Sequence, residues 1–253
     1  MILAPHFRKQ WPEAPHDFFA VEAAGLRWLA SAGAAAVVSV LDVGATEITV
    51  ARLDQAPPTR AAAEAFGTAL AGTHRAGADA FGAPPDGWDG DGYIGRQRLS
   101  FRPERQWGRF YAEQRMLPYA RTARDLGHLT AQQLRVIERI AERIAAGEFD
   151  DARRPARIHG DLWSGNLIST ADGMVLIDPA AHGGHGITDL AMLALFGAPH
   201  LDIILAAYAE AAELPLGWRT LIGLHQLHPL LVHAVSHGPS YGSEAAAIAL
   251  HYL

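Results

Sequence analysis

The chain has 253 residues, of which 49% are hydrophobic and 19% are charged, and its formal net charge is −6. This composition predicts a packed globular protein with one large domain or two small lobes, and it excludes a largely disordered chain. The absence of cysteine excludes disulfides and cysteine-based zinc sites. No basic cluster indicates nucleic-acid binding, and no apolar stretch predicts a signal peptide or a membrane span. We therefore expect a cytoplasmic protein that binds neither nucleic acid nor membranes.

Residues 1–55 are predicted to form a small mixed lobe. Its expected elements are a strand over 1–9, a helix over 18–31 with Asp17 as its N-cap, and strands over 37–43 and 47–53. The proline-bearing segment 55–58 is the predicted boundary with the rest of the chain.

Residues 56–253 are predicted to form a larger, mainly helical lobe. Helices are expected over 60–75, 104–124 and 131–147, and over most of the chain from 188 onward. A Gly-, Pro- and Asp-rich loop covers 76–95, and short strands over 167–169 and 174–177 follow a polar loop at 158–166. A helical lobe with a strand pair directly after a polar loop favours a kinase-like α+β fold over a doubly wound sheet.

Lys9 is the single lysine of the chain, among 21 lysine and arginine residues in total. Arginine replaces lysine readily on a solvated surface, but not where a compact ammonium group must contact a phosphate. Glu22 lies on or beside the apolar face of the helix that follows, where a carboxylate is costly unless a cation pairs with it. This pair matches the strand lysine and helix glutamate that hold the nucleotide phosphates in kinases.

The segment His159–Asn166, HGDLWSGN, carries the residues that phosphoryl transfer requires. Asp161 and Asn166 have the spacing of the catalytic-loop aspartate and asparagine of protein kinases, and Asp178 follows the next strand pair. Asp161 is thus predicted to orient the attacking hydroxyl as a general base. Asn166 and Asp178 are predicted to bind Mg²⁺, and His159 is expected to brace the loop.

HGDLWSGN, together with IDPA and DLAMLALFG further on, resembles the fructosamine kinase (ketosamine 3-kinase) family, a relative of the aminoglycoside phosphotransferases. The resemblance implies a protein-kinase-like fold and transfer of the ATP γ-phosphate to a hydroxyl of a ketosamine. That acceptor would be a free sugar–amine adduct or a glycated protein lysine. The resemblance places Trp163 in the sugar–amine pocket, and we group His159 and His233 with it as candidate substrate-binding residues.

The resemblance also assigns the nucleotide side of the site. Lys9 would contact the α- and β-phosphates of ATP, with Glu22 positioning it, and the backbone of Ala51 to Leu53 would hold the adenine edge. The acidic residues between Asp86 and Asp91 would suit a cationic substrate.

Two features depart from the family pattern. Gly186 and Ile187 stand where the family usually has Arg-Glu, and only eight residues precede Lys9, where the family carries two strands and a glycine-rich turn. Two explanations stay open: the sequence has been cut or starts too late, or the glycine-rich turn is truly absent. In both cases we expect a truncated N-terminal β lobe, whose open sheet edge leaves a monomer or an edge-paired dimer as alternatives. Two functional rivals follow: an aminoglycoside or other small-alcohol phosphotransferase, and a catalytically impaired kinase-like binding protein that lacks the glycine-rich loop.

Overall fold

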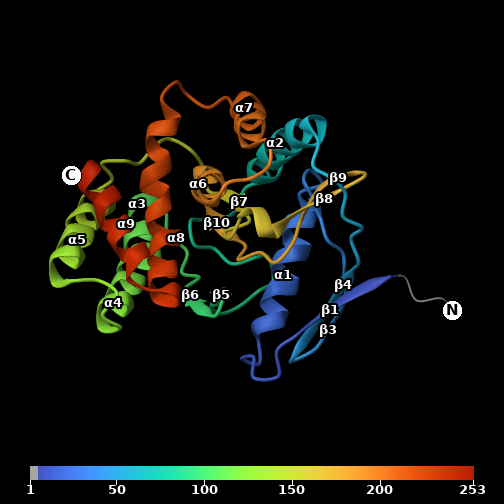
Figure 1. The fold of residues 1–253 in the computed structure, drawn as a ribbon, viewed down its shortest axis with the longest axis horizontal. Coiled ribbons are helices and arrows are strands. Elements are labelled where there is room, and N and C mark those ends of the chain that lie inside the picture. Colours follow the sequence, from blue (N-terminus) through green and yellow to red (C-terminus); the bar gives the residue numbers. More distant parts are fainter. Residues whose placement is uncertain (1–4) are drawn as a thin grey trace.

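A computed structural model describes residues 5–253, and the first four residues of the first predicted strand lie outside the described part. In Figure 1 a sheet built from β1, β3 and β4 lies on the right, and the C-terminal helices gather on the left. Helix α1 (Phe18–Ser31) stands between these two parts and ends where the sequence predicts. The fold is α+β, as expected.

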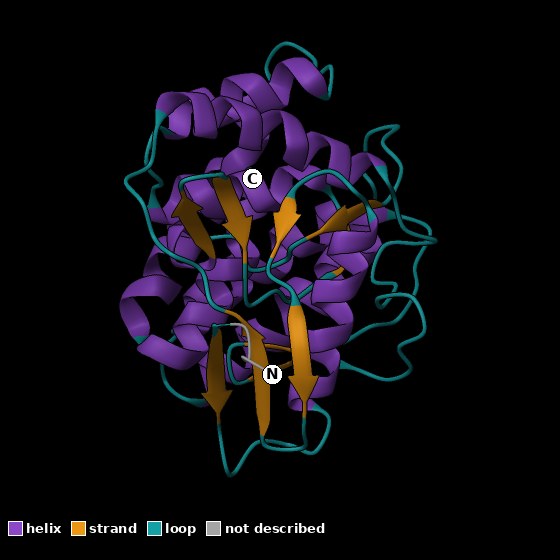
Figure 2. Cartoon of the chain, turned by 90° about the vertical axis from the view of Figure 1, so that its right-hand side faces the viewer, coloured by secondary structure: helices purple, strands orange, loops and turns teal. Residues whose placement is uncertain are grey.

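The small lobe is a three-stranded antiparallel sheet in the order β1–β4–β3, at the lower front of Figure 2. Its strands are β1 (His6–Gln10), β4 (Glu47–Ala51) and β3 (Val40–Val43). Lys9 pairs with Ile48, and directly paired residues share a face of the sheet. Ile48 packs with Phe19 and Leu26 of α1, so Lys9 lies on the helix-covered face. Among the described strands, β1 has β4 as its one neighbour and forms a sheet edge.

A second sheet joins the small lobe to the rest of the chain. Strand β2 (Ala36–Val37) pairs in parallel with β9 (Gly173–Leu176), which pairs antiparallel with β8 (Leu167–Thr170). Gln55, at the predicted lobe boundary, forms a β-bridge with Thr170. The hairpin predicted after the polar loop therefore exists, and it contacts residues from both sides of the boundary.

The remaining residues form a helical lobe. Its longer elements are α2 (Arg60–Arg75), α3 (Trp107–Phe110) continuing through a π-helical segment (Tyr111–Met116) into α4 (Leu117–Asp125), α5 (Ala131–Ala145), α6 (Gly186–Phe196), α7 (Leu201–Ala211), α8 (Ile222–His237) and α9 (Pro239–His251). The core of this lobe is apolar and fully buried around α8, with Leu224, Leu227, Leu230 and Leu231 inside it.

Four short strands are not foreseen by the sequence patterns. They are β5 (Gly92–Ile94) with β6 (Gln97–Leu99), and β7 (Ala156–Ile158) with β10 (His182–Gly184). Each has three residues, which is too few for a period-two pattern to appear. Within the part of the chain that the structure describes, no helix is long and apolar enough to cross a bilayer.

Asp17 occupies the N-cap position of α1, but its predicted capping hydrogen bond does not form. Its carboxylate instead accepts a hydrogen bond from the hydroxyl of Tyr93 at 2.8 Å. Asp17 therefore links α1 to β5, because a long-range phenol donor competes with the local backbone amides for the carboxylate.

The close packing of α2 against α7 makes a stability prediction. A Cβ at Gly67 would lie 2.4 Å from the carbonyl oxygen of Ile204. Replacing a helical glycine by alanine normally stabilises by ~1 kcal/mol. Here the backbone clash should reverse that sign, and Gly67→Ala should lower the free energy of unfolding by about 1–3 kcal/mol. Urea unfolding followed by circular dichroism measures this change.

Ala65→Ser, at an exposed position of the same helix, serves as the control. It should change the free energy of unfolding by less than about 0.5 kcal/mol. A Gly67→Ala protein as stable as the parent would contradict the packing.

Candidate active site

The predicted catalytic loop brings its three acidic and amide residues together. The loop runs from the end of β7 through a 3₁₀ turn at Ser164–Asn166 into β8. The Asn166 amide nitrogen donates to the carboxylate of Asp161 at 3.2 Å and to its carbonyl oxygen at 2.8 Å. The same nitrogen lies 3.3 Å from the carbonyl oxygen of Asp178. Asp178 thus comes within reach of the loop although twelve residues separate it from Asn166.

Lys9 lies between two carboxylates. Its ammonium nitrogen is 2.9 Å from Oε2 of Glu22 and 3.1 Å from Oδ2 of Asp178. Burial lowers the pKa of Lys9, but the two carboxylates raise it by more, so the ammonium group stays charged. Burial also raises the pKa of Glu22 against the opposing effect of Lys9. The contact predicted between Lys9 and Glu22 is present, and Asp178 joins it.

Asp178 has a backbone conformation that its residue type rarely adopts. Its φ is 50°, in the left-handed region that non-glycine residues seldom occupy. Such conformations cost free energy and persist only where surrounding contacts enforce them, which occurs most often at functional sites. The turn directs the Asp178 carboxylate toward Lys9 and its carbonyl oxygen toward Asn166.

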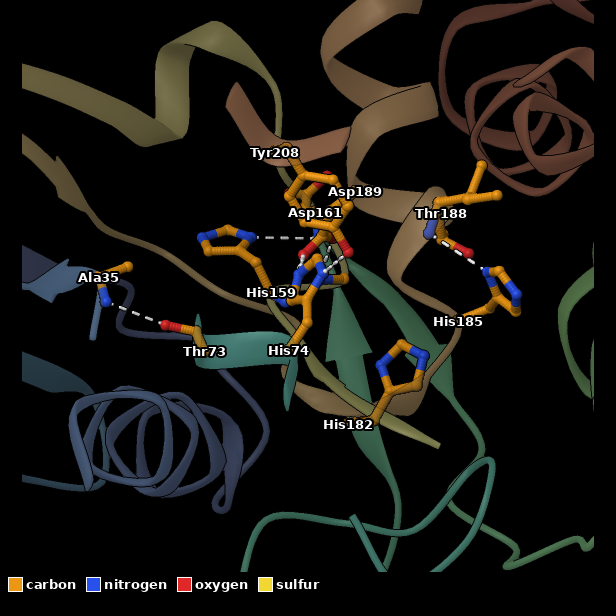
Figure 3. A network of polar contacts seen from close by, with 12 residues as sticks. Ala35, Thr73, His74, His159, Asp161, His182, His185, Thr188, Asp189 and Tyr208 are labelled. Atoms are coloured by element: carbon orange, nitrogen blue, oxygen red, sulfur yellow. Dashed lines mark hydrogen bonds and ion pairs between the residues drawn. The ribbon is translucent and has the colours of Figure 1, made fainter. Parts of the chain in front are cut away.

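A buried carboxylate, that of Asp189 on α6, braces the catalytic loop from behind (Figure 3). Its two oxygens accept hydrogen bonds from the backbone amides of His159 at 2.7 Å and Gly160 at 2.9 Å. His74 of α2 donates a third hydrogen bond through Nε2 at 3.0 Å. Burial raises the pKa of Asp189, but these donors lower it by more, so the carboxylate stays ionised. No local sequence pattern singles out His74 or predicts this role of Asp189.

The family departure at Gly186 has a steric explanation here. The hydroxyl of Tyr208 lies 2.7 Å from Nδ1 of His74. A Cβ at Gly186 would lie 2.4 Å from that hydroxyl and 2.8 Å from Nδ1 of His74, so a larger side chain would displace the pair. Ile187 is buried in the apolar cluster under α7. The His74–Tyr208 pair and an apolar contact thus stand where the family pattern has two charged residues.

His159 lies inside the catalytic loop and does not line the cavities beside Asp161. Its side chain is fully buried. Nε2 donates to the carbonyl oxygen of Ile177 at 2.8 Å, and Nδ1 accepts from the backbone amide of Asp161 at 3.2 Å. Both ring nitrogens are therefore occupied inside the protein. This geometry supports the predicted bracing role of His159. It leaves neither ring nitrogen available for the substrate contact that was the alternative role.

Two cavities meet at Asp161. The first, of about 240 Å³, contains Lys9, Glu22, Asn166 and Asp178 among its lining residues. The second, of about 290 Å³, is lined by His233 and by the aromatic and apolar residues Ile94, Phe196 and Val232. Asp161, Trp163 and Gly95 line both cavities. The carboxylate predicted to act as a base therefore stands at the junction between a polar cavity and a more apolar one.

Other predicted positions lie away from these cavities. Among the described lining residues of both cavities, neither Ala51 nor Leu53 occurs, and the amide of Ala51 donates within the sheet to Ser39 at 2.9 Å. The adenine-edge role of this segment stays a prediction. The acidic loop residues 86–91 are likewise absent from both linings, and Asp86 lines a different cavity. Tyr93 and Phe101 do line the first cavity, but no sequence pattern singles out Phe101.

The side-chain oxygen atoms of Asn166 and Asp178 fit a magnesium ion, which prefers hard oxygen ligands and retains part of its hydration shell. In the described chain, no group of three or more His, Asp or Glu side chains forms a dedicated metal cage. A metal ion here would therefore complete its coordination with phosphate oxygens and water, which is the usual arrangement for Mg²⁺ in kinases.

Comparisons with known proteins agree with this architecture. The fructosamine kinase family model matches residues 4–253. A protein of Enterococcus faecium named as a probable ketoamine kinase is 31% identical over 246 residues, which cover 94% of this chain and 84% of the relative. A Thermobifida fusca crystal structure assigned to fructosamine-3-kinase superposes with a TM-score of 0.89 at 46% identity, covering 98% of this chain and 86% of the other.

A more distant neighbour, the streptomycin–ATP–APH(2")-IIa ternary complex, has a TM-score of 0.59 at 14% identity and covers 97% of this chain and 84% of its own. At that identity the likeness establishes the fold alone, and it confirms the predicted kinase-like arrangement. The whole-chain family match and the relatives above also show that the protein is a kinase that acts on a hydroxyl group. The chain belongs to the fructosamine kinase family.

Proposed function

We propose that this protein is an ATP- and Mg²⁺-dependent kinase that phosphorylates a sugar hydroxyl of a ketosamine. The observation that carries the proposal is the shared position of Asp161 between the cavity of Lys9 and Asp178 and the cavity of His233. A phosphoryl donor in the first cavity and a hydroxyl acceptor in the second would meet at this carboxylate, as in-line transfer requires.

The polar cavity supplies the groups that the donor phosphates require. The Lys9 ammonium, held by Glu22, would contact the phosphates, and release of its contact with Asp178 would free that carboxylate for the metal ion. Asn166 would supply the second metal ligand. A bound magnesium ion would neutralise developing charge on the phosphate oxygens, as in other phosphotransferases. Asp161 would orient the acceptor hydroxyl and take up its proton.

The second cavity supports a sugar-bearing acceptor. Trp163 is 42% exposed and packs edge-to-face against Phe196, which leaves part of the indole available to a ligand. The ring of His233 packs between Phe196 and Tyr241, and its Nδ1 lies 2.8 Å from the Pro229 carbonyl. Burial lowers the pKa of His233, which favours the neutral ring. Nδ1 then donates to Pro229, and Nε2 remains as a hydrogen-bond acceptor for a hydroxyl or amine group.

The charge of this cavity favours a ketosamine over an aminoglycoside. Asp161 is the one acidic residue among the described lining residues of the second cavity. A polycationic aminoglycoside carries several ammonium groups, each of which would need a carboxylate or other acceptor when it is bound. A ketosamine carries one amine and several hydroxyls, which this lining matches better.

Activity measurements on a substrate panel test the proposal. With Mg-ATP, ribulosamine and fructosamine adducts should be phosphorylated, and aminoglycosides should not. Asp161→Asn should lower kcat about 10²–10⁴-fold, since it removes the proton acceptor. Asp172→Asn, at an exposed turn of the β8–β9 hairpin, serves as the control and should retain full activity. Phosphorylation of aminoglycosides alone would contradict the substrate class, and no nucleotide-dependent turnover with any acceptor would contradict the kinase assignment.

The nature of the cation at position 9 gives a second prediction. Lys9→Arg should lower kcat/KM for ATP by roughly a hundredfold, because a longer planar guanidinium cannot keep both charge-assisted hydrogen bonds of the ammonium group. Steady-state kinetics at varied ATP concentration measure the effect. The neighbouring exposed residue provides a matched control, and Arg8→Lys should leave kcat/KM within about twofold, as expected for a weak surface ion pair. Equal activity of Lys9→Arg and the parent would contradict the phosphate-binding role.

The acid limb of the pH–rate profile gives a third prediction. Burial raises the pKa of Asp161 above the ordinary value of 3.8, against the lowering effects of His159 and Asn166. The ionised form acts as the base, so activity is present above this pKa and is lost as the pH falls through it. The acid inflection of kcat/KM, which reports the free enzyme, should therefore lie above 3.8. An inflection at or below that value, in protein shown by circular dichroism to remain folded, would contradict Asp161 as the base.

A further inference from the structure

A third cavity lies apart from the proposed active site. Its volume is about 560 Å³, and it opens between the C-terminal end of α2, the segment before β7 and the end of α7. None of its described lining residues lines either cavity at Asp161. The proposed reaction does not use this space, although its volume is in the range of small-molecule sites.

Arginines converge on this cavity. Arg75, Arg153, Arg154 and Arg157 line it, against two acidic residues, Asp79 and Asp86. The lining therefore carries an excess of two positive charges (four minus two), in a chain whose net charge is −6. Guanidinium groups form paired hydrogen bonds to phosphate and carboxylate, so their convergence suits an anionic ligand.

The direct hydrogen-bond partners of these arginines are mostly neutral groups. Arg75 donates to the carbonyl oxygen of Ala211, and Arg157 donates to the Trp28 carbonyl and the Ser31 hydroxyl, all of which are neutral acceptors. Arg153 has a carboxylate partner, Asp151, at 3.7 Å. Asp151 is shared with His185, whose Nε2 is 3.2 Å away.

Capping of α7 accounts for only part of this arrangement. Arg75 and Arg153 bind carbonyl oxygens at the end of α7 and so satisfy groups that a helix leaves unpaired. Each guanidinium has five N–H donors, and these contacts use one to three of them. Arg154 is exposed and, among the described residues, makes no ion pair. Capping therefore explains neither Arg154 nor the cavity beside it.

The floor of the cavity lies against the brace of the catalytic loop. His74, Tyr208 and Gly186 line it, and His74 binds the same carboxylate of Asp189 that accepts the hydrogen bonds of the loop amides. Figure 3 shows His74, Tyr208 and Asp189 close together, and the His74 ring contacts Tyr208 through Nδ1 and Asp189 through Nε2. A ligand that fills the cavity would therefore contact the residues that hold Asp189, and not the residues at which transfer is proposed to occur.

We propose that this arginine-lined cavity binds a small phosphate-bearing anion at a site separate from the catalytic cleft. Several guanidinium groups around one cavity favour a phosphate dianion over a single carboxylate, because a phosphate presents more acceptor oxygens and more charge to them. The proposal rests on the cavity alone and does not require the proposed kinase reaction.

Calorimetric titration of the full chain with inorganic pyrophosphate tests this proposal. Magnesium is left out, so that metal-bridged binding in the catalytic cleft does not contribute. The parent protein should bind pyrophosphate saturably. The double variant Arg75→Gln/Arg154→Gln should bind at least about tenfold more weakly, since each lost charge-assisted hydrogen bond to a phosphate is worth about 1.5–3 kcal/mol. Circular dichroism would show whether the variant stays folded.

Two controls separate the cavity from other binding modes. Arg121→Gln removes an exposed arginine of α4 that lies away from the cavity, and it should leave the pyrophosphate affinity within about twofold of the parent. Lys9→Met removes the cation of the catalytic cleft and thus any binding there, and the saturable binding that depends on Arg75 and Arg154 should persist in this variant. Loss of binding in Lys9→Met, with retention in the double arginine variant, would overturn the proposal, and so would the absence of saturable binding. Equal weakening in Arg121→Gln would show nonspecific attraction and would also overturn it.

Discussion

The catalytic loop depends on one buried carboxylate. Asp189 receives the backbone amides of His159 and Gly160 and the imidazole of His74, so its charge is offset by three donors inside the protein. A buried carboxylate without such donors would be costly. The loop is therefore fixed directly before Asp161, on the side away from the cavities. The positions of Asp161 and Asn166 follow from this fixed start.

The front of the site depends on a second set of charges that comes from three separate elements. Lys9 comes from an edge strand, Glu22 from the helix that packs on that strand, and Asp178 from the turn after β9. Opposite charges at 2.9 and 3.1 Å make each partner less costly to bury than it would be alone. The same arrangement keeps a cation beside the proposed metal-binding positions. When phosphates bind, a phosphate oxygen would take the place of one of the two carboxylates that contact Lys9.

One of the two departures from the family pattern lies beside the support of the catalytic loop. Gly186 makes room for the His74–Tyr208 pair, which supports Asp189 where the pattern has charged residues. The space beyond this pair is the arginine-lined cavity. The brace of the catalytic loop and the proposed anion site therefore share a wall.

The sequence by itself determined the elements with strong local signals. Helix α1, helix α2 and the hairpin after the polar loop have the predicted places, because apolar periodicity and glycine and proline breaks are local properties. The spacing of Asp161, Asn166 and Asp178 likewise predicted that they lie close together. The single lysine and the glutamate on the apolar side of the next helix predicted the ion pair between Lys9 and Glu22.

Tertiary structure alone decided the other features, because they depend on residues far apart in the chain. Asp17 accepts a hydrogen bond from Tyr93 instead of capping its helix, because the fold places this phenol beside the carboxylate. Strands of three residues exist only because their partners lie beside them. The contact of His74 with Asp189 spans 115 residues, and no spacing rule encodes it. The residues of the catalytic loop could thus be predicted from the local sequence. The support of that loop by Asp189 and His74 could not be predicted in this way.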